Sequence, residues 1–186
     1  MSTLTVLLVI VVALAAFVIG IYNKLVKNKN LVEEGWSGIE TQLKRRANLI
    51  PNLIETVKGY AQHEREALEA VTSMRTRAMS TNDVAERGQA EGMLSQALGK
   101  LFAVAEAYPD LKANENFIGL QNDLSEIENE IQMSRRYYNG TVRNNNVLVE
   151  SFPSNFVAGM FSFDKAKFFE IENPDDRAVP QVDFGN

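Results

Sequence analysis

The sequence contains no cysteine and only one histidine, His63. Disulfides and thiolate metal sites are therefore excluded, and metal or acid–base chemistry that needs several histidines lacks its ligands. A net charge of -5 and a pI near 5.0 argue against a nucleic-acid-binding protein, because such proteins usually carry an excess of basic residues. Only 11 glycines and 5 prolines occur in 186 residues, so long loops are not expected, and the length fits one domain.

The N-terminal stretch also lacks charge. Every residue from Val6 to Ile21 is apolar or glycine, and no charged side chain precedes Lys24. About 20 such residues cross a bilayer as a helix, and the stretch from Leu4 to Val26 is long enough. A cleaved signal peptide would need a basic start and a small-residue cleavage site after the apolar run, and neither is present. We therefore predict a retained transmembrane anchor.

Basic residues lie on one side of this anchor only. Lys24, Lys27 and Lys29 follow it, and none precedes it. The positive-inside rule then predicts a single-pass protein with its N-terminus outside and its body in the cytoplasm. Tyr22 occupies the position of an interfacial aromatic residue.

A helical stripe of apolar residues follows the basic flank, with members three and four positions apart. The stripe consists of Trp36, Ile39, Leu43, Ala47, Ile50, Ile54, Val57 and Ala61. The pattern weakens through the charged stretch at 63–80, and the sequence STND at 80–83 then supplies turn and N-cap residues. The body is therefore predicted to begin with a long amphipathic helix.

Two more helices are predicted after this connection. The second starts near Asp83 and ends at the sequence YPDL, because Pro109 disfavours helix at the residue before it. The sequence KANEN then offers an N-cap for the third. The third helix has an unbroken heptad seam from Phe117 to Phe152, passes through Gly140 and ends at Pro153.

The later part of this seam is polar, with Ser134, Thr141 and Asn145 at seam positions. An aromatic-rich tail follows, with a short helix expected over the sequence NFVAGMF. The predicted fold is all-α: an N-terminal transmembrane helix, an up-and-down bundle of long antiparallel helices, a short C-terminal helix and an irregular aromatic tail. The corresponding regions are the anchor and basic flank (1–29), the bundle (30–153) and the tail (154–186).

Pro51 lies inside the first stripe, and the stripe keeps its phase across it. A proline within a helix leaves the carbonyl four residues earlier, that of Ala47, without its usual donor. A kinked helix persists where side chains or packing satisfy that carbonyl, and the amides of Asn48 and Asn52 are within reach. The alternative is a true break between two helices that happen to be in phase.

Two pairs of arginines, Arg45–Arg46 and Arg135–Arg136, are the most distinctive polar feature. In one interpretation they are exposed charges beside a seam, paired with glutamates at helical spacing. In the other they form a buried polar layer or a subunit contact with Asn48, Asn52, Asn144 and Asn145, which would set register rather than add stability.

Known catalytic and metal-binding motifs do not fit the sequence. His63–Glu64 lacks the second histidine of a zincin, there is no G-x-S-x-G motif, and the glycine spacing in GMLSQALGK is too long for a P-loop. The G-x-x-x-G formed by Gly88 and Gly92 lies in a polar helix and is interpreted as incidental. We therefore predict no catalytic residue, no metal site and no cofactor.

Long blocks of the sequence resemble the LemA family of bacterial membrane proteins. These blocks are WSGIETQLKRRANLIPNLIETVKGYAQHE at 36–64, YPDLKANENFIGLQNDLSEIENEIQMSRRYYNGTVRNNN at 108–146, FPSNFVAGMF at 152–161 and PQVDF at 180–184. The resemblance implies a short anchor in the bacterial inner membrane followed by long helices. It carries over no enzymatic residues, and it links the chain to relatives tied to intracellular membrane formation.

Two classes of function remain open. The first is a non-enzymatic, membrane-anchored scaffold that self-associates and organises or shapes the membrane. The second is an adaptor subunit of another membrane complex, such as a protease or envelope-stress system. The expected partners are the lipid bilayer, further copies of the chain and other membrane proteins, but no nucleic acid. Contacts are expected through the anchor, the polar seam at Asn145 and the tail at Phe161, unless the tail folds back and covers the seam within one chain.

Overall fold

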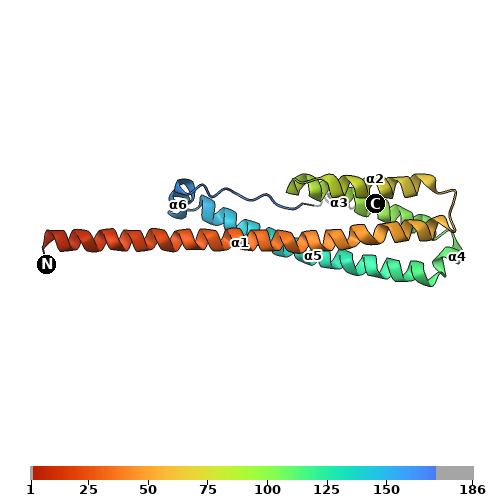
Figure 1. The fold of residues 1–186 in the computed structure, drawn as a ribbon, viewed down its shortest axis with the longest axis horizontal. Coiled ribbons are helices and arrows are strands. Elements are labelled where there is room, and N and C mark those ends of the chain that lie inside the picture. The colour runs from red at the N-terminus through yellow and green to blue at the C-terminus, as the bar shows by residue number, and fades with distance from the viewer. Residues whose placement is uncertain (1, 171–186) are drawn as a thin grey trace, which may run out of the picture. The chain divides into compact units, whose positions relative to one another are not determined.

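The computed structural model describes residues 2–170, and this part of the chain has six α-helices and no strand (Figure 1). The all-α prediction is therefore confirmed. Pro51 lies inside the first helix, which continues through it, and the fifth helix passes through Gly140. The helices are α1 (Thr3–Lys58), α2 (Arg65–Ser80), α3 (Val84–Ala105), α4 (Pro109–Lys112), α5 (Glu115–Glu150) and α6 (Ser154–Met160).

Side-chain caps define two of the predicted helix starts. The Asp83 carboxylate accepts hydrogen bonds from the backbone N–H groups of Ala85 at 3.0 Å and Glu86 at 3.3 Å, at the start of α3. The Asn114 side chain accepts one from the Phe117 N–H at 3.0 Å, at the start of α5. Both caps satisfy donors that have no partner within the helix, and both starts were predicted from the sequence.

The boundary between α1 and α2 was missed, and neither α2 nor α4 was predicted as a separate helix. The apolar stripe continues to Ala61, but α1 ends at Lys58 and α2 begins only at Arg65. Gly59 follows the last helical residue, and the N–H of Ala61 still donates to the Val57 carbonyl at 2.9 Å. Ala61 is fully buried although it lies outside the helix, so its apolar character reflects the core rather than a further helical turn.

The described residues form two compact units, each built from segments far apart in the sequence. The anchor unit contains Met1–Thr41 and Ile131–Phe168. The bundle unit contains Gln42–Glu130 and, among the described residues, also Phe169 and Glu170. Helices α1 and α5 each contribute to both units. The three consecutive regions expected from composition do not coincide with these units and stay a prediction, and the part of the tail beyond Glu170 lies outside the described residues.

The bundle unit has a continuous apolar core. Helices α2 and α3 pack against each other across a connection of three residues, and α1 and α5 supply the remaining inward faces. Burying these aliphatic side chains is the main stabilising contribution to such a bundle. The core includes Ile50, Leu53, Val57, Val71, Leu94, Leu98, Leu101, Leu111, Phe117 and Leu124.

In the anchor unit, α1 approaches α5 closely. A Cβ atom on Gly35 would lie 3.2 Å from the Tyr138 Cα, a tight contact that would require the two helices to move apart by a few tenths of an ångström. The ring of Trp36 lies 5.6 Å from that of Tyr138. The buried seam residues Thr141 and Asn145 continue this inward face of α5.

The first turns of α1 pack against very little. Leu4 is 79 % exposed and Phe17 55 % exposed, and the large aliphatic residues between them are exposed as well. Among the described helices, α1 is the one long and apolar enough to cross a membrane. Exposed apolar surface on this scale is unfavourable in water and favourable in a bilayer.

Candidate functional site

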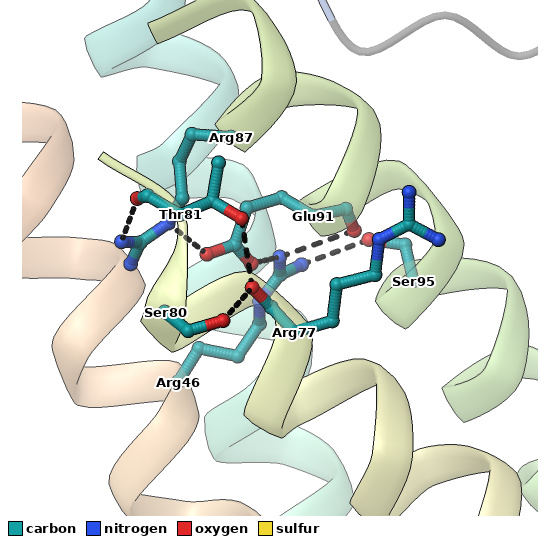
Figure 2. A network of polar contacts seen from close by, with 7 residues as sticks. All are labelled: Arg46, Arg77, Ser80, Thr81, Arg87, Glu91 and Ser95. Carbon is teal, nitrogen blue, oxygen red and sulfur yellow. Dashed lines mark hydrogen bonds and ion pairs between the residues drawn. The ribbon is translucent and has the colours of Figure 1, made fainter. Parts of the chain in front are cut away.

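The bundle unit contains a buried ion-pair network around Arg46 (Figure 2). Arg46 of α1 is 1 % exposed and pairs with the carboxylate of Glu91 of α3, which is 2 % exposed. Its Nη1 donates to Ser95 Oγ at 2.8 Å and to Glu128 Oε2 of α5 at 2.7 Å. One guanidinium therefore joins three helices of the bundle.

A second arginine completes the network. Arg87, one turn before Glu91 on α3, donates from Nε to Glu91 Oε1 at 2.9 Å and from Nη1 to the Thr81 carbonyl at 3.4 Å. Two arginines thus face two glutamates, so the charges balance. Among the described residues, Arg46 Nε has no hydrogen-bond acceptor. Buried pairs of this kind add little net stability but penalise any packing that separates them.

The carbonyl freed by Pro51 has a specific donor. Arg75 Nε of α2 donates to the Ala47 oxygen at 2.7 Å. The amides of Asn48 and Asn52, which the sequence offered for this role, belong to exposed side chains, so that expectation is corrected. An arginine from the neighbouring helix replaces the missing backbone N–H, and the proline is thereby coupled to the contact between α1 and α2.

The four predicted arginines behave differently from one another. Arg46 is buried, whereas Arg45 is exposed and donates to Gln42 Oε1 of its own helix at 3.0 Å. Arg135 is half-buried and Arg136 is exposed. The buried-layer interpretation therefore holds for Arg46 alone. Its predicted asparagine partners were wrong, because carboxylates and a serine hydroxyl contact it instead.

A groove of 460 Å³ lies beside the network. Its walls combine apolar side chains with hydroxyl, amide and carboxylate groups of α3 and α5. The lining residues are Arg46, Ser95, Leu98, Gly99, Phe102, Gln121, Leu124, Ser125, Glu128 and Asn129. Among the residues that the structure describes, no group of three or more His, Asp or Glu side chains is placed to hold a metal ion.

The chain after α6 folds back along the polar seam of α5. The side-chain amide of Asn146 makes two hydrogen bonds with the backbone of Ala166. It accepts one from the Ala166 N–H at 2.8 Å and donates one to the Ala166 carbonyl at 3.0 Å. Asn145 donates to the Asp164 carbonyl at 3.4 Å, and Tyr138 donates to that of Lys167 at 2.8 Å. The seam at Asn145 is therefore covered within one chain, the alternative left open by the sequence. Burial raises the pKa of the Tyr138 hydroxyl.

Glu170, which belongs to the bundle unit, lies against α3. A Cβ atom on Gly88 would lie 2.3 Å from the Glu170 carbonyl oxygen, which is closer than two such atoms can approach. Gly88 and Gly92 are both buried. Gly88 of the G-x-x-x-G pair is therefore not incidental, because its missing side chain makes room for the backbone of Glu170.

The end of the apolar span forms the second notable surface, within the anchor unit. Leu25 of α1 is buried against Val157 and Ala158 of α6. The ring of Tyr22 makes edge contacts with those of Phe161 at 4.8 Å and Phe163 at 5.6 Å. Tyr22, predicted as an interfacial residue, is therefore in contact with the C-terminal aromatic residues. Lys24 and Lys27 follow it and are exposed.

A comparison with known protein families identifies the family of this chain, which has a long apolar helix followed by a helical bundle. Residues 35–184 match the model of the LemA family. The chain belongs to the LemA family. This match covers most of the chain and includes Arg46 and all of the helical bundle.

Three similar proteins extend this likeness. Protein LemA of Metamycoplasma hominis is 28% identical over 162 residues, which cover 84% of this chain and 74% of the relative. Magnetosome protein MamQ 1 of Paramagnetospirillum magneticum is 24% identical over 200 residues, covering 92% and 74%. Magnetosome protein MamQ of Magnetospirillum gryphiswaldense is 21% identical over 203 residues, covering 92% and 75%. Membership of the LemA family and the apolar span fit a membrane-associated protein.

Sequence reasoning missed four residues of the network and its surroundings, among them Arg87. Glu91 and Ser95 supply partners for Arg46, and Arg75 supplies the donor for the proline-freed carbonyl. One signal was available, because Glu91 precedes Leu94 by three positions and so falls on the apolar stripe of α3. A charged residue on such a stripe predicts a buried partner of opposite charge.

Proposed function

We propose that the protein is a non-enzymatic, single-pass scaffold that self-associates at the membrane and organises it. One observation carries this proposal: the apolar span and the first helix of the folded body are the same helix, α1. The span is exposed, whereas the buried charged groups of the body pair with one another in an ion-pair network. The relatives named magnetosome proteins support a role at a membrane.

The proposed orientation places the N-terminus outside and the body in the cytoplasm. Three lysines after the span support it. The absence of cysteine makes the test simple, because one introduced thiol is the only one present. We expect a membrane-impermeant thiol reagent to label Ser2→Cys in intact cells and Asn82→Cys only after permeabilisation. Labelling of Asn82→Cys in intact cells would reverse the proposed topology.

Self-association is supported by the exposed face of α5 in the anchor unit. Met133 is 48 % exposed, Tyr137 49 % and Val147 55 %, and Arg136 lies on the same side. Aromatic, methionine and arginine side chains are enriched at protein interfaces. The seam residue Asn145 is covered by its own chain, so we place the contact with a second copy on this outward face of α5 rather than on the seam.

Photo-crosslinking in native membranes tests the proposal. A photoreactive aromatic residue at Tyr137 should give adducts at multiples of the chain mass, whereas the same group at exposed Glu69 of α2 should give few. Adducts to other proteins alone would favour the adaptor function. Equal, weak yields at both positions would remove the support for an interface on α5.

A further inference from the structure

An uncharged, outward-facing apolar patch surrounds α6. No charged side chain occurs between Glu150 and Asp164, a stretch of 13 residues that contains the helix. Four large apolar side chains in it face away from the core. The interfacial patch, as we call it, consists of Phe152 (81 % exposed), Phe156 (68 %), Met160 (73 %) and Phe161 (48 %). Such a patch on a folded chain indicates a binding surface.

The opposite side of α6 is firmly held. Val157 and Ala158 are buried against Leu25, and Val18 and Ile21 pack on the same cluster. All of these contacts lie within the anchor unit. The interfacial patch is therefore presented outward from α1 by a packed helix.

These contacts fix the depth of α6 relative to the apolar span. The span ends where Lys24 introduces the first charge, and the contacting residues of α1 run from Val18 to Leu25. At a rise of 1.5 Å per residue, that interval covers about 10 Å around the end of the span. Tyr22, the residue type favoured where hydrocarbon meets headgroups, contacts Phe161 at this level.

Charged residues flank the uncharged stretch in the sequence. Glu150 directly precedes the uncharged stretch and forms an exposed ion pair at 2.7 Å with Lys165, which follows exposed Asp164 at the other end. On α1, Lys24 and Lys27 are exposed immediately after the span. An uncharged apolar patch with aromatic side chains, close to exposed charged residues, fits the boundary between hydrocarbon and headgroups.

We infer that the interfacial patch inserts into the membrane leaflet where the α1 span ends, with its aromatic side chains at the boundary between headgroups and acyl chains. This inference rests on the proposed membrane anchor. It adds a second attachment that a single-pass protein does not need in order to stay in the bilayer. Since an interfacial helix occupies one leaflet only, its binding depends on membrane curvature, which would connect this attachment to membrane shaping.

Tryptophan fluorescence in vesicles tests the insertion. The chain has one tryptophan, so Trp36→Phe gives a silent background for full-length variants. The proteins are reconstituted into phosphatidylcholine vesicles carrying acyl chains brominated near either the headgroup or the chain end. Phe156→Trp reports on the patch, and Phe17→Trp reports on the span. Exposed Glu40→Trp of α1 lies about 24 Å beyond the end of the span and serves as the control.

We expect Phe156→Trp to be quenched several-fold more by shallow than by deep bromines, Phe17→Trp to be quenched by deep ones, and Glu40→Trp by neither. Quenching of Phe17→Trp with none at Phe156→Trp would overturn the insertion and leave the anchor intact. A blue-shifted but unquenched Phe156→Trp would show that another protein copy covers the patch, which also overturns it. No quenching at Phe17→Trp would overturn the anchor and the insertion together.

Discussion

Replacing Glu91 with leucine should strongly destabilise the bundle unit. Glu91→Leu keeps a side chain of similar size but removes the carboxylate that Arg46 and Arg87 share. Arg87 is 14% exposed and can turn towards water, whereas Arg46 is 1% exposed and would keep only Glu128 and a serine hydroxyl. A buried charge that loses one partner costs about 3–5 kcal/mol.

The expected loss of unfolding free energy is large enough to measure by thermal denaturation. For a chain of this length, about 3–5 kcal/mol corresponds to a fall of roughly 6–20 °C in the melting temperature. The assay follows helical circular dichroism of the full-length protein in detergent. The control is Glu55→Leu, which removes the carboxylate of an exposed ion pair with Lys58 and should cost no more than about 1 kcal/mol.

A double variant separates loss of the ion pair from loss of packing. Arg46→Met combined with Glu91→Leu removes both buried charges, and Arg87 and Glu128 can then be hydrated. The double variant should therefore be more stable than Glu91→Leu alone. The reasoning is refuted if Glu91→Leu costs no more than Glu55→Leu, or if the two network substitutions simply add.

Three further predictions follow from single contacts. Arg75→Met should lower the free energy of unfolding by about 1–3 kcal/mol, because the Ala47 carbonyl loses its donor. The loss should be smaller in a Pro51→Ala background, where the backbone N–H of residue 51 can donate to the same carbonyl. Equal losses in both backgrounds would contradict this coupling. Gly88→Ala should displace the C-terminal stretch and speed trypsin cleavage after its lysines, whereas Gly99→Ala, with open space around it, should raise stability by about 0.5–1 kcal/mol. The neutral Tyr138 hydroxyl donates to the returning chain and has a raised pKa, so its stabilising contribution should be present below about pH 10 and lost as the pH rises through that raised pKa. Ultraviolet titrations of the unchanged protein and of Tyr138→Phe differ by the ionisation of Tyr138. If that ionisation occurs at the ordinary pKa of tyrosine, the prediction is refuted.

Local signals predicted most of the helices. The stripes at spacings of three and four, the caps at Asp83 and Asn114, and the uncharged N-terminal stretch are all properties of neighbouring residues. The break after Lys58 was missed because Ala61, buried in a turn, continues the period by coincidence. Periodicity reports burial, and a buried turn residue gives the same signal as a helical one.

The polar contacts were harder to predict because they depend on tertiary register. Arg46 was singled out, but its partner Glu91 lies 45 residues away on a helix whose register against α1 the sequence does not specify. Likewise, the donor to the Ala47 carbonyl comes from Arg75, 28 residues later, rather than from the nearby asparagines. Sequence spacing constrains partners within one helix, whereas pairs between helices follow from the packed core.

Self-association at the membrane is the central claim, and the mass of the protein in its native lipids tests it most directly. Full-length protein would be extracted with a lipid-retaining polymer, without detergent, and its particles weighed by native mass spectrometry. The account predicts particles that contain lipid and several copies of this chain. Particles with a single copy, alone or bound to a different membrane protein, would contradict it.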